Sequence, residues 1–174
     1  MTEQPLINRV ANSGLITLNL EDDYPTQEMV TIDIKEYLFH GLILKEKEFR
    51  TALKEINWSD FENKIVLVYC STDAIIPVWA YMLISSLVTP YATDVFQGAK
   101  DEYLRYYYKN LIGSRSYQEF DGQRIVIKGC SKKPVPPSAY LELTAALQPY
   151  AQSIMYGEPC STVPIFKRPR KLRK

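Results

Sequence analysis

Short apolar runs of the length of a strand recur along this chain. Residues 15–20 and 30–34 alternate apolar and polar side chains, the two-residue period of a half-buried strand. Residues 65–69 and 125–128 begin with continuous β-branched apolar side chains, which is typical of a strand buried on both faces. The pattern therefore predicts two half-buried strands near the N-terminus and two buried strands further along the chain.

Helical patterns separate these runs. An apolar stripe predicts a helix over 35–56, where Gly41 is a candidate break, and a second helix over 99–112. A further helix follows each buried strand and ends near Val88 or Leu147, because a proline two residues later excludes the helical conformation. Short strands are expected next, at 94–96 and 153–156.

Part of this pattern occurs twice. Ile65–Ala92 aligns with Ile125–Ala151 at ten identical positions of 27 when Trp79 is left unpaired. The alignment predicts two tandem repeats of about 60 residues, approximately 36–98 and 99–157, each with the order helix, strand, Cys-Ser loop, helix and strand. We therefore expect an α/β fold with a mostly parallel sheet flanked by helices.

Length and charge restrict the possible partners. A chain of 174 residues fits one domain, predicted here as residues 1–166, followed by a basic flexible tail over 167–174. The net charge is +1, but six positive charges lie in that tail, so the rest of the chain carries −5. This balance does not favour nucleic acid as a partner, apart from weak contact by the tail. Crowded tyrosines in the 99–112 helix favour a core or a homodimer contact.

The three cysteines are the residues most suggestive of chemistry. Cys70, Cys130 and Cys160 each precede a serine, and each is expected directly after a strand. In an open parallel sheet, ligands bind beyond the carboxyl ends of the strands. The pattern therefore places three thiols where a ligand site is expected.

Three interpretations of these cysteines remain open. They are small buried side chains, or reactive thiols, or thiolate ligands of zinc or an iron–sulfur cluster. For the metal interpretation, the predicted ligands are Cys70, Cys130, Cys160 and Asp73, and the other candidates for the fourth position are Glu158, His40, water and a residue of a partner. The chain has no Gly-rich nucleotide-binding loop and no GxSxG motif, so other common catalytic sites lack support.

The compartment follows from what the chain lacks. An odd number of cysteines, no signal peptide and no apolar stretch long enough for a membrane span predict a cytoplasmic protein.

Four segments together resemble a known family. They are NRVANSGLITLNLEDDYP, CSTDAIIPVWAYM, KGCSKKPVPPSAY and IMYGEPCSTVPIFKRP. They resemble the bacterial domain-of-unknown-function family 2480 over about residues 7–169. The resemblance implies genes placed beside the sulfur-mobilisation genes of iron–sulfur cluster assembly, and it implies no catalytic residue.

These observations lead to one functional hypothesis and two alternatives. The hypothesis is a cytoplasmic accessory protein of iron–sulfur cluster assembly that binds zinc or an iron–sulfur cluster through its three cysteines. The first alternative is a non-enzymatic interaction or scaffold protein with structural cysteines and a protein partner or homodimer. The second alternative is a thiol-dependent enzyme.

Overall fold

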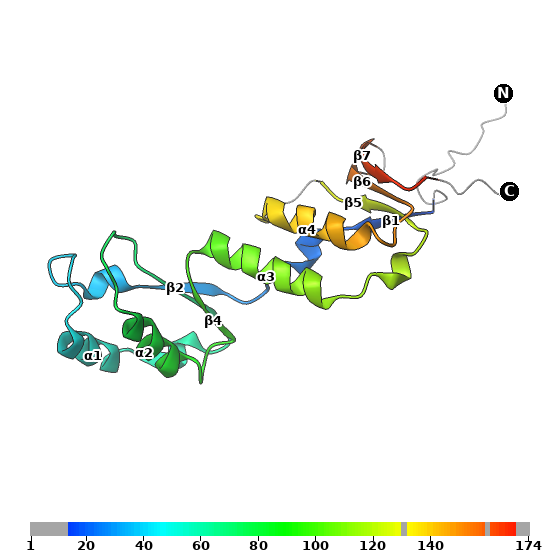
Figure 1. Ribbon diagram of the computed structural model, residues 1–174. Helices are drawn as coiled ribbons and strands as arrows, with labels where there is room; N and C mark the ends of the chain where they lie inside the picture. The colour runs from blue at the N-terminus through cyan, green and yellow to red at the C-terminus, as the bar shows by residue number, and fades with distance from the viewer. Residues whose placement is uncertain (1–13, 130–131, 159–160, 170–174) are drawn as a thin grey trace, which may run out of the picture. The chain divides into compact units, whose positions relative to one another are not determined.

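The computed structural model describes residues 14–129, 132–158 and 161–169. Within these ranges the chain forms four α-helices and two sheets, both rich in parallel strand pairs (Figure 1). The helices are α1 (Glu46–Lys54), α2 (Val78–Val88), α3 (Lys100–Ser114) and α4 (Pro137–Leu147). Four short 3₁₀ helices are η1 (Leu20–Asp23), η2 (Ile34–Tyr37), η3 (Trp58–Phe61) and η4 (Gln118–Phe120). The predicted α/β class is confirmed.

The strands form two sheets, so the prediction of one sheet is wrong. Each sheet belongs to a different compact unit of the chain. We call Pro25–Tyr103 the central unit, and Met1–Tyr24 with Leu104–Lys174 the terminal unit. The central unit is thus inserted in the sequence between two parts of the terminal unit. The domain boundaries derived from the sequence, 1–166 and 167–174, stay predictions.

The central unit contains a three-stranded parallel sheet. Its order is β2 (Met29–Asp33), β3 (Ile65–Tyr69) and β4 (Asp94–Gln97). The middle strand is buried on both faces, which explains its continuous apolar sequence. Val66 and Val68 share a core with side chains of α1 and α2, so both helices pack on that face of the sheet.

The terminal unit contains a four-stranded sheet. The order is β1 (Leu15–Leu18), β5 (Arg124–Ile127), β6 (Ser153–Glu158) and β7 (Ser161–Lys167), and only β7 is antiparallel. Ile125 and Ile127 lie in one core with residues of α3 and α4. Like the central unit, this unit has three parallel strands and helices that share a core with the middle strand, and it has one antiparallel strand in addition.

The two N-terminal strands belong to different sheets. β1 pairs with β5, and β2 pairs with β3, in each case parallel. A hairpin between the two strands is therefore excluded, although the alternating sequences fit either arrangement.

The chain does not form one helix over 35–56, and the turn that interrupts it contains Gly41, the predicted candidate break. Residues 34–37 form η2, a turn follows with Gly41 at φ 71°, and α1 begins only at Glu46. Phe49 and Leu53, one turn apart on α1, are buried, so the apolar stripe was correct for that part.

Matching contacts in the two units lie 59 residues apart. Trp58 donates from Nε1 to the carbonyl of Leu53, and Tyr117 donates from its hydroxyl to the carbonyl of Ile112, both at 3.2 Å. Positive φ angles recur at the same spacing, 60° at Asn63 with 68° at Gly122, and 142° at Gly98 with 125° at Gly157. The same spacing relates two backbone hydrogen bonds, from the Asn63 N–H to the Tyr91 carbonyl and from the Gly122 N–H to the Tyr150 carbonyl.

The constant spacing changes the alignment of the two segments. It matches Pro77 with Pro136, the residues that precede the first turn of α2 and of α4. No gap is then needed at Trp79, which matches Ser138. The alignment of Ile65–Ala92 with Ile125–Ala151, which was chosen for its identities, is therefore one residue out of register over β3 and β5 and the sequence that follows them. The description of the chain as two tandem repeats stays a prediction.

The strand β7 was missed from the sequence. It runs antiparallel to β6 at the edge of the sheet and contains Pro164, a residue that edge strands tolerate. Lys167, assigned from the sequence to the tail, pairs with Ser153. The Arg168 guanidinium donates to the carbonyls of Gln148 and Pro149, at the end of α4.

Candidate functional site

Cys70 is the first of the predicted ligands, and it directly follows β3 as expected. The thiol is half-buried, and its sulfur lies 3.3 Å from Thr72 Oγ1. The backbone N–H of Ser71 donates to Asp33 Oδ1 at 3.1 Å, which ties this loop to the end of β2. The Cys70 loop is thus fixed at the carboxyl edge of the central sheet.

Asp33 carries a perturbed carboxyl group beside this loop. Burial raises its pKa, but hydrogen bonds from the Ser71 hydroxyl and from the backbone of Lys35 and Ser71 outweigh burial. The pKa of Asp33 is therefore lower than its ordinary value. The carboxylate also caps η2, because Oδ1 accepts from the Lys35 N–H at 3.0 Å. These bonds give Asp33 a structural role in holding two segments together.

The predicted metal site stays a prediction. Asp73 is exposed, and Cys130 and Cys160 lie outside the described residues. Among the residues that the structure describes, no group of three or more His, Cys, Asp and Glu side chains could hold a metal ion.

The cysteines are not at matching positions in the two units. With the spacing of 59 residues, Cys70 matches Gly129, and Ser71 matches position 130. The Cys-Ser step of the second unit therefore comes one residue later than that of the first. Cys70 and Gly129 both lie after the ends of their strands, and a shift of one residue means that equivalent surroundings cannot be inferred from the shared Cys-Ser sequence.

The neighbours of Cys130 and Cys160 in the sequence lie at one edge of one sheet. The Tyr156 hydroxyl donates to the carbonyl of Gly129 at 3.2 Å, which joins the end of β5 to β6. Glu158, at the end of β6, pairs with Ser161, at the start of β7.

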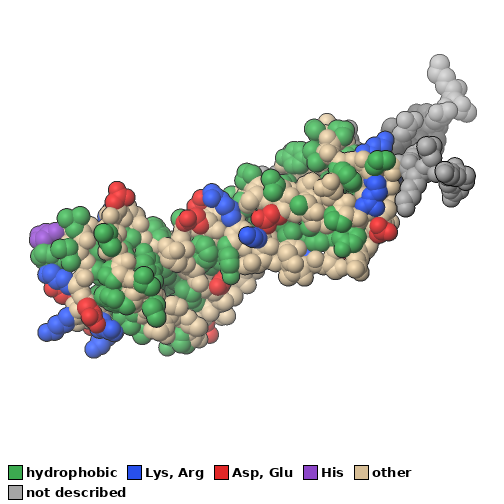
Figure 2. All heavy atoms as spheres, viewed as in Figure 1, with side chains coloured by type: hydrophobic (Ala, Val, Ile, Leu, Met, Phe, Trp, Pro, Cys, Tyr) green, Lys and Arg blue, Asp and Glu red, His purple; other side chains and the backbone are tan. Residues whose placement is uncertain are grey.

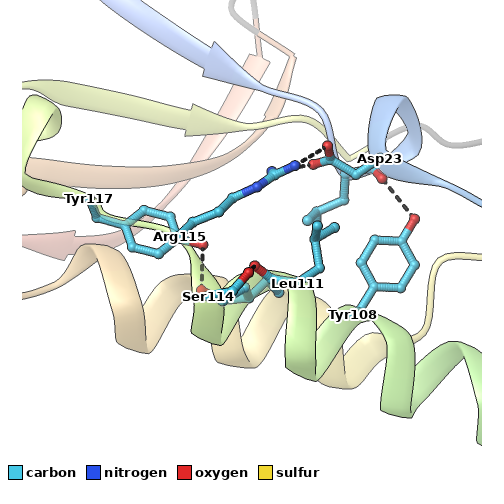
Figure 3. Close-up of polar contacts among 8 residues, drawn as sticks. Asp23, Tyr108, Leu111, Ser114, Arg115 and Tyr117 are labelled. Carbon is cyan, nitrogen blue, oxygen red and sulfur yellow. Dashed lines mark hydrogen bonds and ion pairs between the residues drawn. The ribbon is translucent and has the colours of Figure 1, made fainter.

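A partly exposed ion pair in the terminal unit was not expected from the sequence. Arg115 donates from Nη1 and Nη2 to the two carboxylate oxygens of Asp23, at 2.7 and 2.6 Å (Figure 3). The pair lines a cavity of about 440 Å³ beside β1 and the end of α3. The two residues are 92 positions apart, so no local pattern signals the contact.

Two tyrosines stand near this ion pair. Tyr108 donates to the carbonyl of Leu20 at 2.8 Å, and burial, reinforced by the charge of Asp23, raises its pKa strongly. Burial also raises the pKa of Tyr117. The hydrogen bond with Asp23 raises the pKa of Arg115. The charges of Asp23 and Arg115 compensate each other, and both tyrosines stay protonated. This arrangement is therefore best explained as structural, because it holds η1 against α3 and the residue that follows it.

Exposed apolar side chains lie in the segment that enters α2 and on α2 itself. Ile75, Val78 and Met82 are 92%, 73% and 66% exposed, and the last two lie one helical turn apart. Hydrophobic side chains are visible on the surface over α1 and α2 (Figure 2). We call Ile75, Val78 and Met82 the α2 patch. The sequence did not reveal it, because α2 is apolar apart from Ser85 and Ser86, and no periodicity separates its buried from its exposed positions.

A groove of about 470 Å³ adjoins this patch. It lies between α2, which contributes Tyr81, Met82 and Ser85, and the strand β4, which contributes Val95 and Gln97. Its walls are mainly apolar, and its floor reaches Val68 of β3. The groove and the α2 patch share Met82, so they form one continuous surface of the central unit.

The fold and surface define an α/β protein with two parallel-rich sheets and an exposed apolar face. The chain belongs to DUF2480, a family described as protein of unknown function, whose sequence model matches residues 4–168. The resemblance found in the sequence is thereby confirmed. No curated protein and no solved structure matches the chain. No helix within the described ranges is long and apolar enough to cross a membrane.

Proposed function

We propose that this protein is a non-enzymatic interaction protein that binds a partner protein through the α2 patch. The observation that carries the proposal is the exposure of Ile75, just before α2, together with that of Val78 and Met82, one helical turn apart on α2. Single exposed apolar residues are ordinary on protein surfaces, whereas adjoining ones mark interaction sites.

The energetics support a binding role. Burial of a Val, Ile or Met side chain contributes about 1.5–3 kcal/mol to association when it is complete. Three such side chains beside an apolar groove can therefore provide the small central cluster that dominates the affinity of many interfaces. In the free protein these side chains contribute little to folding, because they remain exposed.

The proposal is tested by replacing Ile75, Val78 and Met82 with serine together. The matched control is Leu141→Ser, which changes a side chain that is 72% exposed at the α4 position matching Met82. Both variants should keep the stability of the native protein within about 0.5 kcal/mol. Partners captured from native cells and quantified by mass spectrometry should be lost with the triple variant and retained with the control. Equal capture by all three proteins would refute the role of the patch.

A second candidate is the accessory protein of iron–sulfur cluster assembly that binds zinc or a cluster through Cys70, Cys130 and Cys160. Its support is that Gly129, Glu158 and Ser161, the described residues next to two of these cysteines, lie at one sheet edge. Thiolate ligands suit both zinc and iron.

The metal proposal is tested by metal and sulfide analysis of protein purified without oxygen. Single Cys70→Ser, Cys130→Ser and Cys160→Ser variants show which thiols bind. Stoichiometric metal that disappears in the variants would support the site. A protein that binds no zinc or iron after reconstitution would exclude it.

A further inference from the structure

Among the described residues, β4 is the last strand of its sheet, whereas the corresponding strand of the terminal unit, β6, has a further neighbour. β4 pairs with β3 alone among the described residues, whereas β6, its match in the terminal unit, pairs on its outer side with the antiparallel strand β7. We infer that the groove between α2 and β4 binds an extended segment of a partner protein, antiparallel to β4, in the way that β7 occupies the terminal unit. This inference rests on the proposed function and names the surface and the kind of partner.

The backbone of β4 is oriented for this pairing. The Gly98 N–H donates to the Val68 carbonyl at 2.9 Å, so Gly98 and the alternate residues of β4 face β3. Val95 and Gln97 consequently direct their backbone groups outward. The Val95 N–H already donates to Asp94 Oδ1 at 2.8 Å. The Gln97 N–H therefore remains as the outward donor for an added strand.

The side-chain groove matches the position that β7 fills in the other unit. Phe166 of β7 lies opposite Ile154 of β6 and packs against the core of the terminal unit. Val95 is the match of Ile154, and it lines the groove of about 470 Å³ beside Met82. An apolar or aromatic side chain of the partner would occupy this space.

The charges indicate what should follow that apolar residue. Lys167 lies opposite Ser153, whose match in the central unit is Asp94, so a basic residue there would meet a carboxylate. Arg168 donates to the carbonyls of Gln148 and Pro149 at the end of α4. The matching carbonyls at the end of α2 belong to Thr89 and Pro90, both exposed. The expected segment is therefore an apolar or aromatic residue followed by two basic residues.

A labelled peptide with the sequence of residues 161–169, STVPIFKRP, is a direct probe for the full-length protein. Fluorescence anisotropy should show saturable binding, which Met82→Arg weakens at least about tenfold, because Arg places a charge in the apolar groove. Leu141→Arg is the matched control at the exposed α4 position that matches Met82, in the unit whose sheet edge β7 already pairs with, and it should bind the peptide as the native protein does. A peptide with glutamate in place of Lys167 and Arg168 should bind at least about tenfold more weakly.

Hydrogen exchange locates the bound strand. The Gln97 amide should become protected when the native-sequence peptide binds, and Met82→Arg should abolish this protection. The inference is overturned if the peptide does not bind, if both arginine variants weaken binding equally, or if β4 gains no protection. Protection of β4 that depends on protein concentration without peptide would mean pairing with a second copy, which also overturns it. Capture of partners through the α2 patch is measured separately, so failure here leaves the proposed function standing.

Discussion

Asp33 shows how one carboxylate can join two segments of this fold. It accepts hydrogen bonds from the backbone of Lys35 in η2 and of Ser71 in the loop that follows β3. These bonds keep its pKa below the ordinary value of 3.8 in the folded protein. The carboxylate form therefore stabilises the folded state above that value, and this contribution is lost as the pH falls through the folded-state pKa.

Replacement of Asp33 by alanine should lower the free energy of unfolding by about 1 kcal/mol at neutral pH, the usual cost of losing a capping side chain. Urea unfolding at pH 7 and below pH 3.8 would measure it, and the difference from the native protein should shrink in acid. Asp33→Asn is the control, because it keeps an oxygen acceptor and removes the charge. A difference that widens in acid would contradict this account of Asp33.

At the scale of elements, the turn before each middle strand requires a left-handed backbone. Asn63 has a φ of 60° before β3, and Gly122 has a φ of 68° before β5. A Cβ on Gly122 would meet no atom within 4 Å, so only the backbone conformation opposes a side chain there. Asparagine and glycine both tolerate this conformation, whereas other residues pay about 1–2 kcal/mol.

Asn63→Ala and Gly122→Ala should therefore each destabilise the protein by about 1–2 kcal/mol. The exchanges Asn63→Gly and Gly122→Asn serve as controls and should have effects below about 0.5 kcal/mol. Thermal and urea unfolding provide the comparison. If alanine proved as well tolerated as the exchanged residue at both positions, the left-handed turns would not be the constraint.

Local sequence patterns predicted most of the elements but not their assembly. The buried strands and the ends of α2 and α4 followed from apolar runs and from Pro90 and Pro149. The pairing of β1 with β5 depends on a partner more than a hundred residues away, which no local pattern encodes. The strand β7 was missed because Pro164 argues against a strand in the sequence. Proline is tolerated there only because β7 lies at the edge of the sheet.

The cysteine site stays a prediction, and the alignment behind it illustrates how sequence identity can mislead. An alignment that counts identical residues pairs Cys70 with Cys130. The identical Cys-Ser dipeptides count fully in it, whereas apolar strand residues that are only similar do not. The matched contacts instead align Cys70 with Gly129. A strand alternates its side chains between two faces, so a shift of one residue changes the surroundings of every side chain. The α2 patch was equally hidden, because exposure on a uniformly apolar helix depends on tertiary packing.

At the scale of the whole molecule, the described residues form two similar α/β units, of which the terminal unit has the additional edge strand β7. In the central unit, β4 pairs with β3 alone among the described residues and adjoins the groove and the α2 patch, whereas β7 pairs with the matching strand of the terminal unit. This difference is the physical basis for assigning partner binding to the central unit.

The most direct test of the account is site-specific photo-crosslinking in native cells. A photoreactive residue replaces Met82 in one sample and Leu141 in the other, since both positions are largely exposed and lie at matching places on α2 and α4. The account predicts that position 82 crosslinks to a defined partner protein and that position 141 does not. Absence of a crosslinked partner at position 82, or the same products from both positions, would contradict it.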